Sequence, residues 1–183
     1  MRIISGKYKG RNLVSFMANH IRPTMDRVKE TIFNKWMMSI AEAKVLDLFA
    51  GTGNLGLEAL SRDASHVTFV EKNGKSLHII RQNIKILKIL DKDYDLFQTD
   101  VFDFLKKKQK HEFDLIFIDP PFTEKLAHSV MMAISESSIF SNDTRIVIES
   151  VKQEVIENEY GSLVCYDRLD YGDKKVSFFK KKD

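Results

Sequence analysis

The sequence predicts an α/β fold in which a mostly parallel sheet, covered by helices on both faces, ends in an antiparallel hairpin. Between residues 44 and 148, short apolar runs alternate with helical stretches, and this alternation builds right-handed βαβ units. Two more β-like runs, Ser162–Leu169 and Lys174–Phe179, have only a short turn between them, so they should pair antiparallel. A length of 183 residues, 43% of them hydrophobic, suits one domain spanning 1–183.

The first 22 residues are expected to form a basic N-terminal arm or hairpin. Two apolar pairs, Ile3-Ile4 and Leu13-Val14, are separated by Gly6 and Gly10. Residues 1–30 hold seven basic and two acidic side chains, a charge of +5, whereas the whole chain carries +3. Such an arm can hold a phosphate backbone, although a solvated face explains the same charge. The candidate RNA-binding residues are Lys7, Lys9, Arg11 and Arg22.

A helix packed on the core is expected over residues 23–40. Thr24 is its expected N-cap, and apolar residues recur along it at helical spacing. Parallel strands are then expected at Lys44–Phe49, His66–Glu71, Tyr94–Thr99, Phe113–Ile118 and Thr144–Ile148. The helices expected between them include Leu55–Ser61, Lys75–Leu87 and Val101–Lys107. In such a sheet a ligand binds beyond the carboxyl ends of the strands, where the strand order reverses.

A glycine-rich loop follows the first of these strands. Asp47–Gly56 contains the pattern G-x-G-x-x-G between a strand and a helix, which is the context in which this pattern binds nucleotides. Gly51 and Gly53 allow a tight turn and a close approach of the backbone to a ligand. Glu71 ends the second strand, 20 residues after Gly51, where a carboxylate accepts hydrogen bonds from ribose hydroxyls. The loop and Glu71 together predict a nucleotide-type ligand.

The charge of this loop distinguishes two classes of ligand. Asp47 at its mouth would repel the pyrophosphate of a dinucleotide, which binds at the positive end of a helix. S-adenosylmethionine instead carries an amino group and a sulfonium, and both are better matched by a carboxylate. Asp100 follows the third strand and is placed to accept from an adenine amino group, to cap the next helix, or to do both.

The most specific feature is Asp119-Pro120-Pro121-Phe122, at the end of an apolar strand. Two prolines make the turn rigid, so Asp119 and the Pro120 carbonyl present two acceptors to one amino group. Phe122 offers a ring on which a base can stack. An exocyclic amino group is a weak nucleophile, and two acceptors stabilise the positive charge that develops as it is methylated. We therefore expect amino methylation, with no pH–rate limb tied to Asp119 near neutral pH.

Other catalytic chemistry has little support in the sequence. Cys165 lies in an apolar run, which indicates packing, and the five His are scattered, so neither a cysteine nucleophile nor a metal site is expected. The polar start differs from a signal peptide, and no apolar run approaches the roughly 20 residues that span a bilayer. We expect a soluble, cytoplasmic protein without membrane contact.

The chain resembles the RsmD-type bacterial 16S rRNA (guanine-N2)-methyltransferases along nearly its whole length. The resemblance rests on six segments that occur in the family's order: Met1–Arg11, Arg22–Glu30, Asp47–Gly56, Phe69–Glu71, Asp119–Phe122 and Tyr171–Asp173. Residues 14–20 depart from the Gly/Pro-rich family pattern. The resemblance implies a class I S-adenosylmethionine-dependent methyltransferase fold, Rossmann-like, with a seven-stranded sheet and a small N-terminal extension.

The resemblance also implies the ligands and the roles of individual residues. The cofactor would be S-adenosylmethionine without a metal, and the substrate one guanine amino group of 16S rRNA within the small ribosomal subunit. We expect a monomer. The implied cofactor-binding residues are Asp47, Phe49, Gly51, Gly53, Glu71, Asp100, Val101 and Thr24, with Arg22 bordering the site. The implied catalytic residues, which hold the target base, are Asp119, Pro120, Pro121 and Phe122.

Three other classes of protein share part of these features. An amino-methyltransferase acting on DNA, protein or another RNA would use the same turn, but sequence-specific DNA enzymes generally need a further recognition region. A nucleotide-binding oxidoreductase explains the glycine loop and Glu71, but neither Asp47 nor the proline turn. A non-catalytic RNA-binding module explains only the basic arm.

Overall fold

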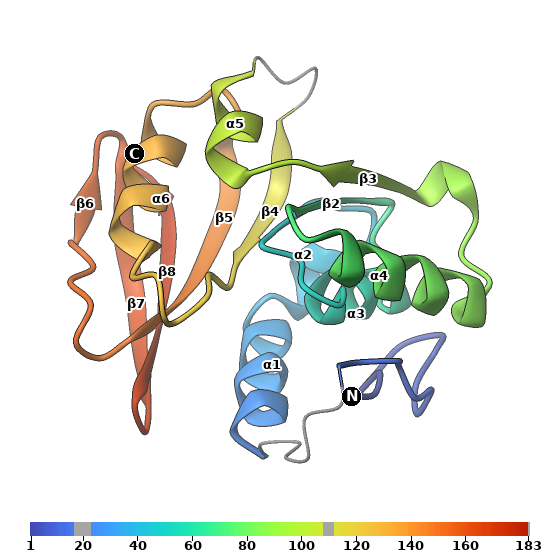
Figure 1. The fold of residues 1–183 in the computed structure, drawn as a ribbon. Helices are drawn as coiled ribbons and strands as arrows, with labels where there is room; N and C mark the ends of the chain where they lie inside the picture. Colours follow the sequence, from blue (N-terminus) through green and yellow to red (C-terminus); the bar gives the residue numbers. More distant parts are fainter. Residues whose placement is uncertain (17–22, 108–111, 183) are drawn as a thin grey trace.

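An eight-stranded mixed sheet forms the centre of the protein, with strand order β3-β2-β1-β4-β5-β8-β7-β6. The computed structural model describes residues 1–16, 23–107 and 112–182, and the side chains of residues 23–25 lie outside this description. Helices cover both faces of the sheet (Figure 1). Within the described ranges, no helix is long and apolar enough to cross a membrane.

Five parallel strands make up one side of the sheet. They are β1 (Lys44–Leu48), β2 (His66–Glu71), β3 (Tyr94–Gln98), β4 (Phe113–Ile118) and β5 (Phe140–Val151). All five strands predicted from the sequence are therefore confirmed. The fifth is longer than expected because it pairs with β4 on one side and, antiparallel, with β8 on the other.

Three antiparallel strands complete the sheet: β6 (Glu159–Tyr160), β7 (Leu163–Tyr171) and β8 (Lys174–Lys181). The predicted hairpin is confirmed, because β7 and β8 pair from Leu163↔Lys181 to Tyr171↔Lys174. The two-residue strand β6 pairs with β7 and brings the sheet to eight strands, one more than the resemblance implies. The chain thus reverses direction beyond β5, and the parallel strands all end at one edge.

The helices are α1 (Pro23–Lys35), α2 (Met37–Ile40), α3 (Asn54–Ser61), α4 (Gly74–Leu87), α5 (Val101–Lys106) and α6 (Ala127–Ser135), with a 3₁₀ turn at Asp91–Asp93. Two expectations were wrong. Thr24 is not an N-cap, because the helix already begins at Pro23, whose fixed φ suits a first helical position. The helix expected over 23–40 is two helices, because the Ser39 N–H bonds the Trp36 carbonyl at 2.8 Å, which tightens the turn and ends the α-helical ladder.

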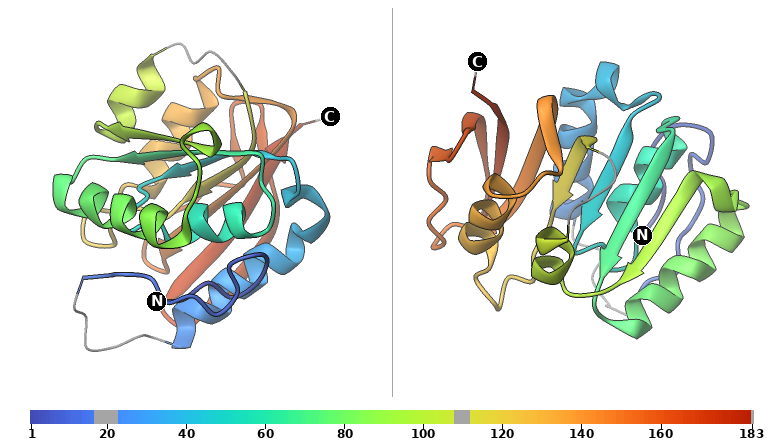
Figure 2. Two further views of the ribbon diagram at one scale, coloured as in Figure 1. Left: turned by 90° about the vertical axis from the view of Figure 1, so that its right-hand side faces the viewer. Right: turned by 90° about the horizontal axis from the view of Figure 1, so that it is seen from above.

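Each face of the sheet has its own hydrophobic core. Alternate residues of a strand point to opposite faces, so Val45 and Phe117 pack with α1, α3 and α4 on one face. Leu46 and Ile116 pack with α5 and α6 on the other face. Figure 2 shows the two helical layers on either side of the sheet. The described side chains of both layers leave the carboxyl ends of the parallel strands accessible.

The N-terminal segment is folded onto α3 by one buried acid, Glu58. Its carboxylate accepts from the backbone N–H groups of Ile4 at 2.8 Å and Ser5 at 2.9 Å. It also forms ion pairs with Lys29 at 3.2 Å and Arg62 at 2.9 Å. Burial lowers the pKa of Lys29, and the charge of Glu58 opposes this shift. The start of the chain is therefore a docked hairpin and not a free, extended arm.

Candidate active site

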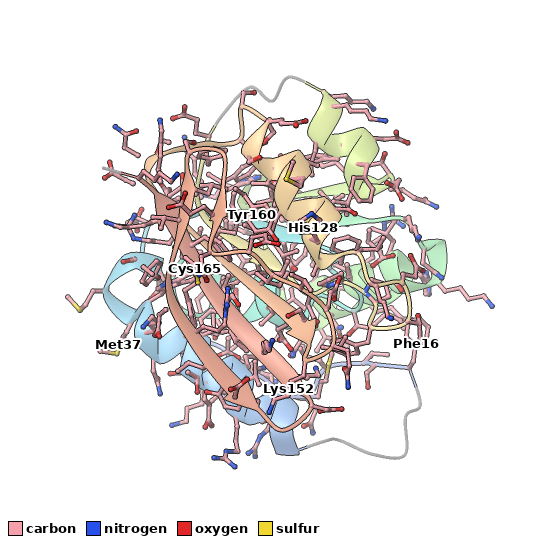
Figure 3. The ribbon with its side chains drawn as sticks, turned by 90° about the vertical axis from the view of Figure 1, so that its left-hand side faces the viewer. Phe16, Met37, His128, Lys152, Tyr160 and Cys165 are labelled. Atoms are coloured by element: carbon pink, nitrogen blue, oxygen red, sulfur yellow. The ribbon has the colours of Figure 1, made fainter. Side chains whose placement is uncertain are left out.

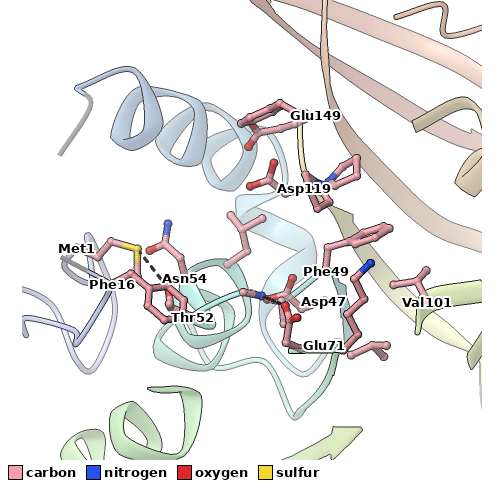
Figure 4. Close-up of a pocket in the computed structure, with 18 of the residues that line it drawn as sticks. Met1, Phe16, Asp47, Phe49, Thr52, Asn54, Glu71, Val101, Asp119 and Glu149 are labelled. Carbon is pink, nitrogen blue, oxygen red and sulfur yellow. Dashed lines mark hydrogen bonds between the residues drawn. The ribbon is translucent and has the colours of Figure 1, made fainter. Parts of the chain in front are cut away.

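A cavity of about 370 Å³ lies at the carboxyl ends of the parallel strands. It opens where the strand order reverses between β1 and β4, the usual position of a ligand in such sheets. Each parallel strand, or the segment just after it, contributes one acid to the wall: Asp47, Glu71, Asp100, Asp119 and Glu149. Figure 4 shows Glu149, Asp119, Asp47 and Glu71 following one another across the cavity. The volume suits a nucleoside-sized ligand.

The glycine loop between β1 and α3 forms one wall. Gly53 takes a φ of 84°, a left-handed conformation that a side chain would strain. Gly56 brings α3 against β2, because a Cβ at Gly56 would lie 2.3 Å from the ring of Phe69. The first residues of α3, Asn54 and Leu55, consequently line the cavity.

Glu71 both holds the loop and faces the cavity. Its Oε2 accepts from the Gly51 N–H at 2.8 Å, and its Oε1 accepts from the Asn73 N–H at 2.7 Å. These two charge-assisted bonds fix the carboxylate at the end of β2. Each oxygen keeps further capacity to accept, which is what two ribose hydroxyls require.

Asp47 is buried beneath the loop. It is 1% exposed, and its Oδ2 accepts from the Gly56 N–H at 2.9 Å. Burial raises the pKa of Asp47 to about 7, and the bond from Gly56 opposes that shift. A cation bound beside it would favour the ionised form. The side chain therefore suits a positively charged ligand and disfavours a phosphate.

Asp100 and Val101 form the part of the wall beside β3. The Asp100 side chain accepts from the Phe102 N–H at 2.9 Å and caps α5. The predicted capping role is therefore confirmed, and the same side chain also faces the cavity.

The turn after β4 supplies the opposite wall. Asp119 Oδ1 is buried and has no hydrogen-bond partner among the residues that the structure describes. No described residue donates to the Pro120 carbonyl, whereas the Pro121 carbonyl accepts from the Glu124 N–H at 3.1 Å. Two acceptors thus remain for a ligand. Phe122 is 40% exposed, so its ring is available at the rim.

The surroundings of Asp119 bear on the expectation that no pH–rate limb near neutral pH belongs to this residue. Burial raises the pKa of Asp119 well above its usual value, and the nearby charges of Glu149 and Asp47 raise it further. Lys174 opposes this shift. Burial is the larger cause, and the three acids that the sheet brings together from neighbouring strands add to it.

The chain is similar to a known protein family along nearly its whole length. Over residues 1–180 the chain matches the family described as Conserved hypothetical protein 95. It is 38% identical to Ribosomal RNA small subunit methyltransferase D of Haemophilus influenzae, over 84% of this chain and 80% of that protein. The chain belongs to the small subunit rRNA methyltransferase D family. It is also 36% identical, over the full length of both, to a Bacillus subtilis protein named as a candidate rRNA methyltransferase, YlbH.

The fold of this family member agrees with a solved structure. That structure, yhhF from Escherichia coli, is named as a candidate methyltransferase and superposes with a TM-score of 0.88 at 28% identity. The match covers 100% of this chain and 98% of the other. The predicted class of fold, a methyltransferase sheet with antiparallel terminal strands, is therefore confirmed.

Most site residues predicted for this methyltransferase D homologue meet in one cavity: Asp47, Phe49, Gly51, Glu71, Asp100, Val101, Asp119, Pro120, Pro121 and Phe122. Gly53 caps α3 instead of lining the cavity. Lys7, Lys9 and Arg11 are exposed on the docked hairpin, outside the cavity wall. The Thr24 side chain and Arg22 lie outside the described residues.

Sequence reasoning missed several wall residues, above all Glu149. The signal was present, because Glu149 follows the apolar run of β5 as Glu71 follows that of β2. Lys29, Asn54, Met1 and Phe16 also line the wall. Asn54 lies within the predicted glycine loop, whereas Lys29, Met1 and Phe16 come from segments whose position depends on tertiary packing, so no local pattern marks those three.

Cys165 lies away from the cavity, as its apolar surroundings predict. It is half-buried on β7, and its Sγ donates to the Asp167 carbonyl at 3.3 Å. Figure 3 shows Cys165 over the β7–β8 side of the molecule, apart from Phe16 of the cavity wall.

Replacing Glu71 with alanine is expected to weaken the affinity for S-adenosylmethionine by about 1–3 kcal/mol, because buried polar partners lose their acceptor. Isothermal titration calorimetry measures the change. Exchanging Glu136, an exposed acid outside the cavity wall, for alanine is the matched control and should leave the affinity unchanged. Unaltered binding by the Glu71 variant would show that the cofactor pocket lies elsewhere.

Proposed function

We propose that the protein transfers the methyl group of S-adenosylmethionine to the exocyclic N2 amino group of one guanine in 16S rRNA. The S–CH₃ bond breaks as the N–CH₃ bond forms, S-adenosylhomocysteine is the other product, and the methylated nitrogen then loses one proton to solvent. The observation that carries the proposal is the pair of free acceptors at Asp119 Oδ1 and the Pro120 carbonyl. Both residues line the cavity whose other wall is the glycine loop. Relatives named for methylation of small-subunit rRNA support the substrate class.

The residues present fit the cofactor. S-adenosylmethionine, when bound, supplies an electrophilic methyl group. Glu71 would bind its ribose, Asp47 its positively charged part and Asp100 its adenine amino group. The fit rests on the donor set of the wall: five acids line it against two lysines, Lys29 and Lys72. Lys29 is already ion-paired with Glu58, so the wall favours a cationic ligand over a pyrophosphate.

Asp119 and Pro120 act on the amino group of the base. Their acceptors bind its two hydrogens and favour a pyramidal nitrogen, whose lone pair then points at the methyl donor. The carboxylate also stabilises the positive charge that develops on this nitrogen. Phe122 stacks on the base and keeps the nitrogen in line with the donor, which converts the encounter into an intramolecular step.

The docked hairpin would contact the rRNA. Lys7, Lys9 and Arg11 are exposed on it, and its attachment to α3 through Glu58 fixes them relative to the site. We propose that the protein acts as a monomer on assembling small subunits in the cytoplasm.

Changing Lys7, Lys9 and Arg11 to glutamate is expected to weaken binding to small-subunit rRNA and to lower the salt slope of log K by about three, because each phosphate contact contributes about one. Filter binding at several salt concentrations measures the slope. The same change of charge at Arg81, Lys85 and Lys92, which are exposed elsewhere, is the control. A slope identical in both variants would leave the hairpin as a solvated face.

Methylation itself tests the proposed function. Purified protein and labelled S-adenosylmethionine are incubated with small subunits, naked 16S rRNA or DNA, and the modified nucleotide is identified by mass spectrometry. We expect label on the N2 atom of one guanine in rRNA. Label on DNA, on another base or on no substrate would refute the proposal. Reduction of a nicotinamide cofactor would instead support the alternative function, that of a nucleotide-binding oxidoreductase.

A further inference from the structure

Glu149 is a second acid at the substrate end of the cavity. It lies near the carboxyl end of β5, is 7% exposed, and lines the same wall as Asp119. The two carboxylates are close enough that the negative charge of Glu149 contributes to the raised pKa of Asp119. Figure 4 shows Glu149 adjacent to Asp119, on the side away from Glu71.

Lys174 holds Glu149 in place. Lys174 is 6% exposed. Its Nζ lies 3.1 Å from Glu149 Oε2. Among the described residues, the other oxygen, Oε1, takes part in no hydrogen bond. Pairing with a buried ammonium favours the charged form of a carboxylate and restricts its orientation. Glu149 therefore presents one oriented oxygen, Oε1, that no described residue bonds.

The same lysine limits where a base can stack. Lys174 Nζ lies 3.9 Å from the centre of the Phe122 ring, so it covers one face of that ring. A base would then stack on the other face. With its amino group at Asp119 and Pro120, as the proposed function requires, the neighbouring atom of its Watson–Crick edge would lie on the side of Glu149, which is next to Asp119 in the cavity wall (Figure 4).

That neighbouring atom differs between purines. In guanine the atom beside the N2 amino group is N1, which carries a hydrogen. In adenine and in 2-aminopurine N1 carries a lone pair. An ionised carboxylate only accepts hydrogen bonds, so it attracts the first edge and repels the second.

We propose that Glu149, fixed by Lys174, selects guanine by accepting a hydrogen bond from N1–H of the target base. The inference rests on the proposed function, since it concerns the same site. An ion pair that only joins β5 to β8 would stabilise the fold equally well but would be indifferent to the base.

The test uses a base that keeps the reacting amino group and loses N1–H. Once the target guanine is mapped, splinted ligation places 2-aminopurine at that position of 16S rRNA. Single-turnover methylation is measured for wild type, Glu149→Gln and Glu154→Gln. Glu154 is the matched control, because it is 8% exposed and accepts from the Ala127 N–H at 2.6 Å, outside the cavity wall.

Wild type should prefer guanine by about 10²-fold or more, because a buried acceptor left facing a lone pair is strongly unfavourable. A glutamine amide can donate to N1 of 2-aminopurine, so Glu149→Gln should reduce the preference at least about tenfold. Glu154→Gln should keep the wild-type preference. The preference is a ratio and is independent of the folded fraction of each variant.

Three results would overturn the inference. If wild type methylates both bases equally, or if Glu149→Gln slows both in proportion, Glu149 does not select the base, while the proposed function stands. If wild type fails on the guanine RNA itself, the proposed function and the inference fall together. Should Glu149→Gln not fold, the double variant with Lys174→Gln, which removes both charges of the pair, gives the same ratio.

Discussion

Replacement of Asp119 by alanine is expected to lower kcat for rRNA methylation by about 10²–10³-fold, the loss typical of one preorganised electrostatic partner. Asp119 Oδ1 is buried and without a partner in the described part of the chain, so in the folded protein it is reserved for a ligand. Rapid-quench single-turnover kinetics measures the change. Affinity for S-adenosylmethionine should change far less, because the acceptor acts on the base.

Asp119→Asn separates charge from shape. The amide keeps an oxygen acceptor and loses the negative charge, so an intermediate loss of rate is expected.

Burial beside Glu149 and Asp47 raises the pKa of Asp119, so lowering the pH protonates the better acceptor and kcat/KM should fall. Asp47, with a pKa raised to about 7, titrates in the same profile. Asp119→Asn should remove only the limb that belongs to Asp119. Near-normal methylation by Asp119→Ala would contradict the mechanism.

Replacement of Glu58 by alanine is expected to lower the free energy of unfolding by about 3–5 kcal/mol, because it strands a buried charge. Lys29 is 1% exposed and would lose its anionic partner. The N–H groups of Ile4 and Ser5 would lose their acceptor as well. The N-terminal hairpin should then detach from α3. Urea unfolding followed by circular dichroism measures the loss.

The matched control for Glu58 is Glu30, an exposed acid one residue from Lys29. Glu30→Ala should change the free energy of unfolding by less than about 0.5 kcal/mol, as surface substitutions usually do. A loss below about 1 kcal/mol for Glu58→Ala would mean that water replaces the carboxylate. The hairpin would then be held by the packing of Ile3 and Leu13.

Local patterns were enough to predict most of the fold. The apolar runs of β2 and β4 were predicted with the bounds that the structure has, because buried strands are short, apolar and bounded by turns. The glycine loop and the Asp119–Phe122 turn were predicted for a related reason: glycine and proline restrict their own backbone wherever they occur. Helix ends were less accurate. At Thr24 the helix had already begun, at Pro23, whose fixed φ suits that position. At Trp36 the carbonyl accepts from the Ser39 N–H, and this competing bond ends the helix.

The sequence by itself therefore determined which segments become strands along the chain, the glycine loop and the Asp119–Phe122 turn. It also determined four of the five acids around the cavity. Only the tertiary structure decided which acids are neighbours, because charges interact through space and not along the chain. Glu149 and Lys174 meet across β5 and β8, and Lys29 meets Glu58 between α1 and α3. The raised pKa of Asp119 and that of Asp47 likewise follow from burial, which belongs to the packed sheet and to no segment of it.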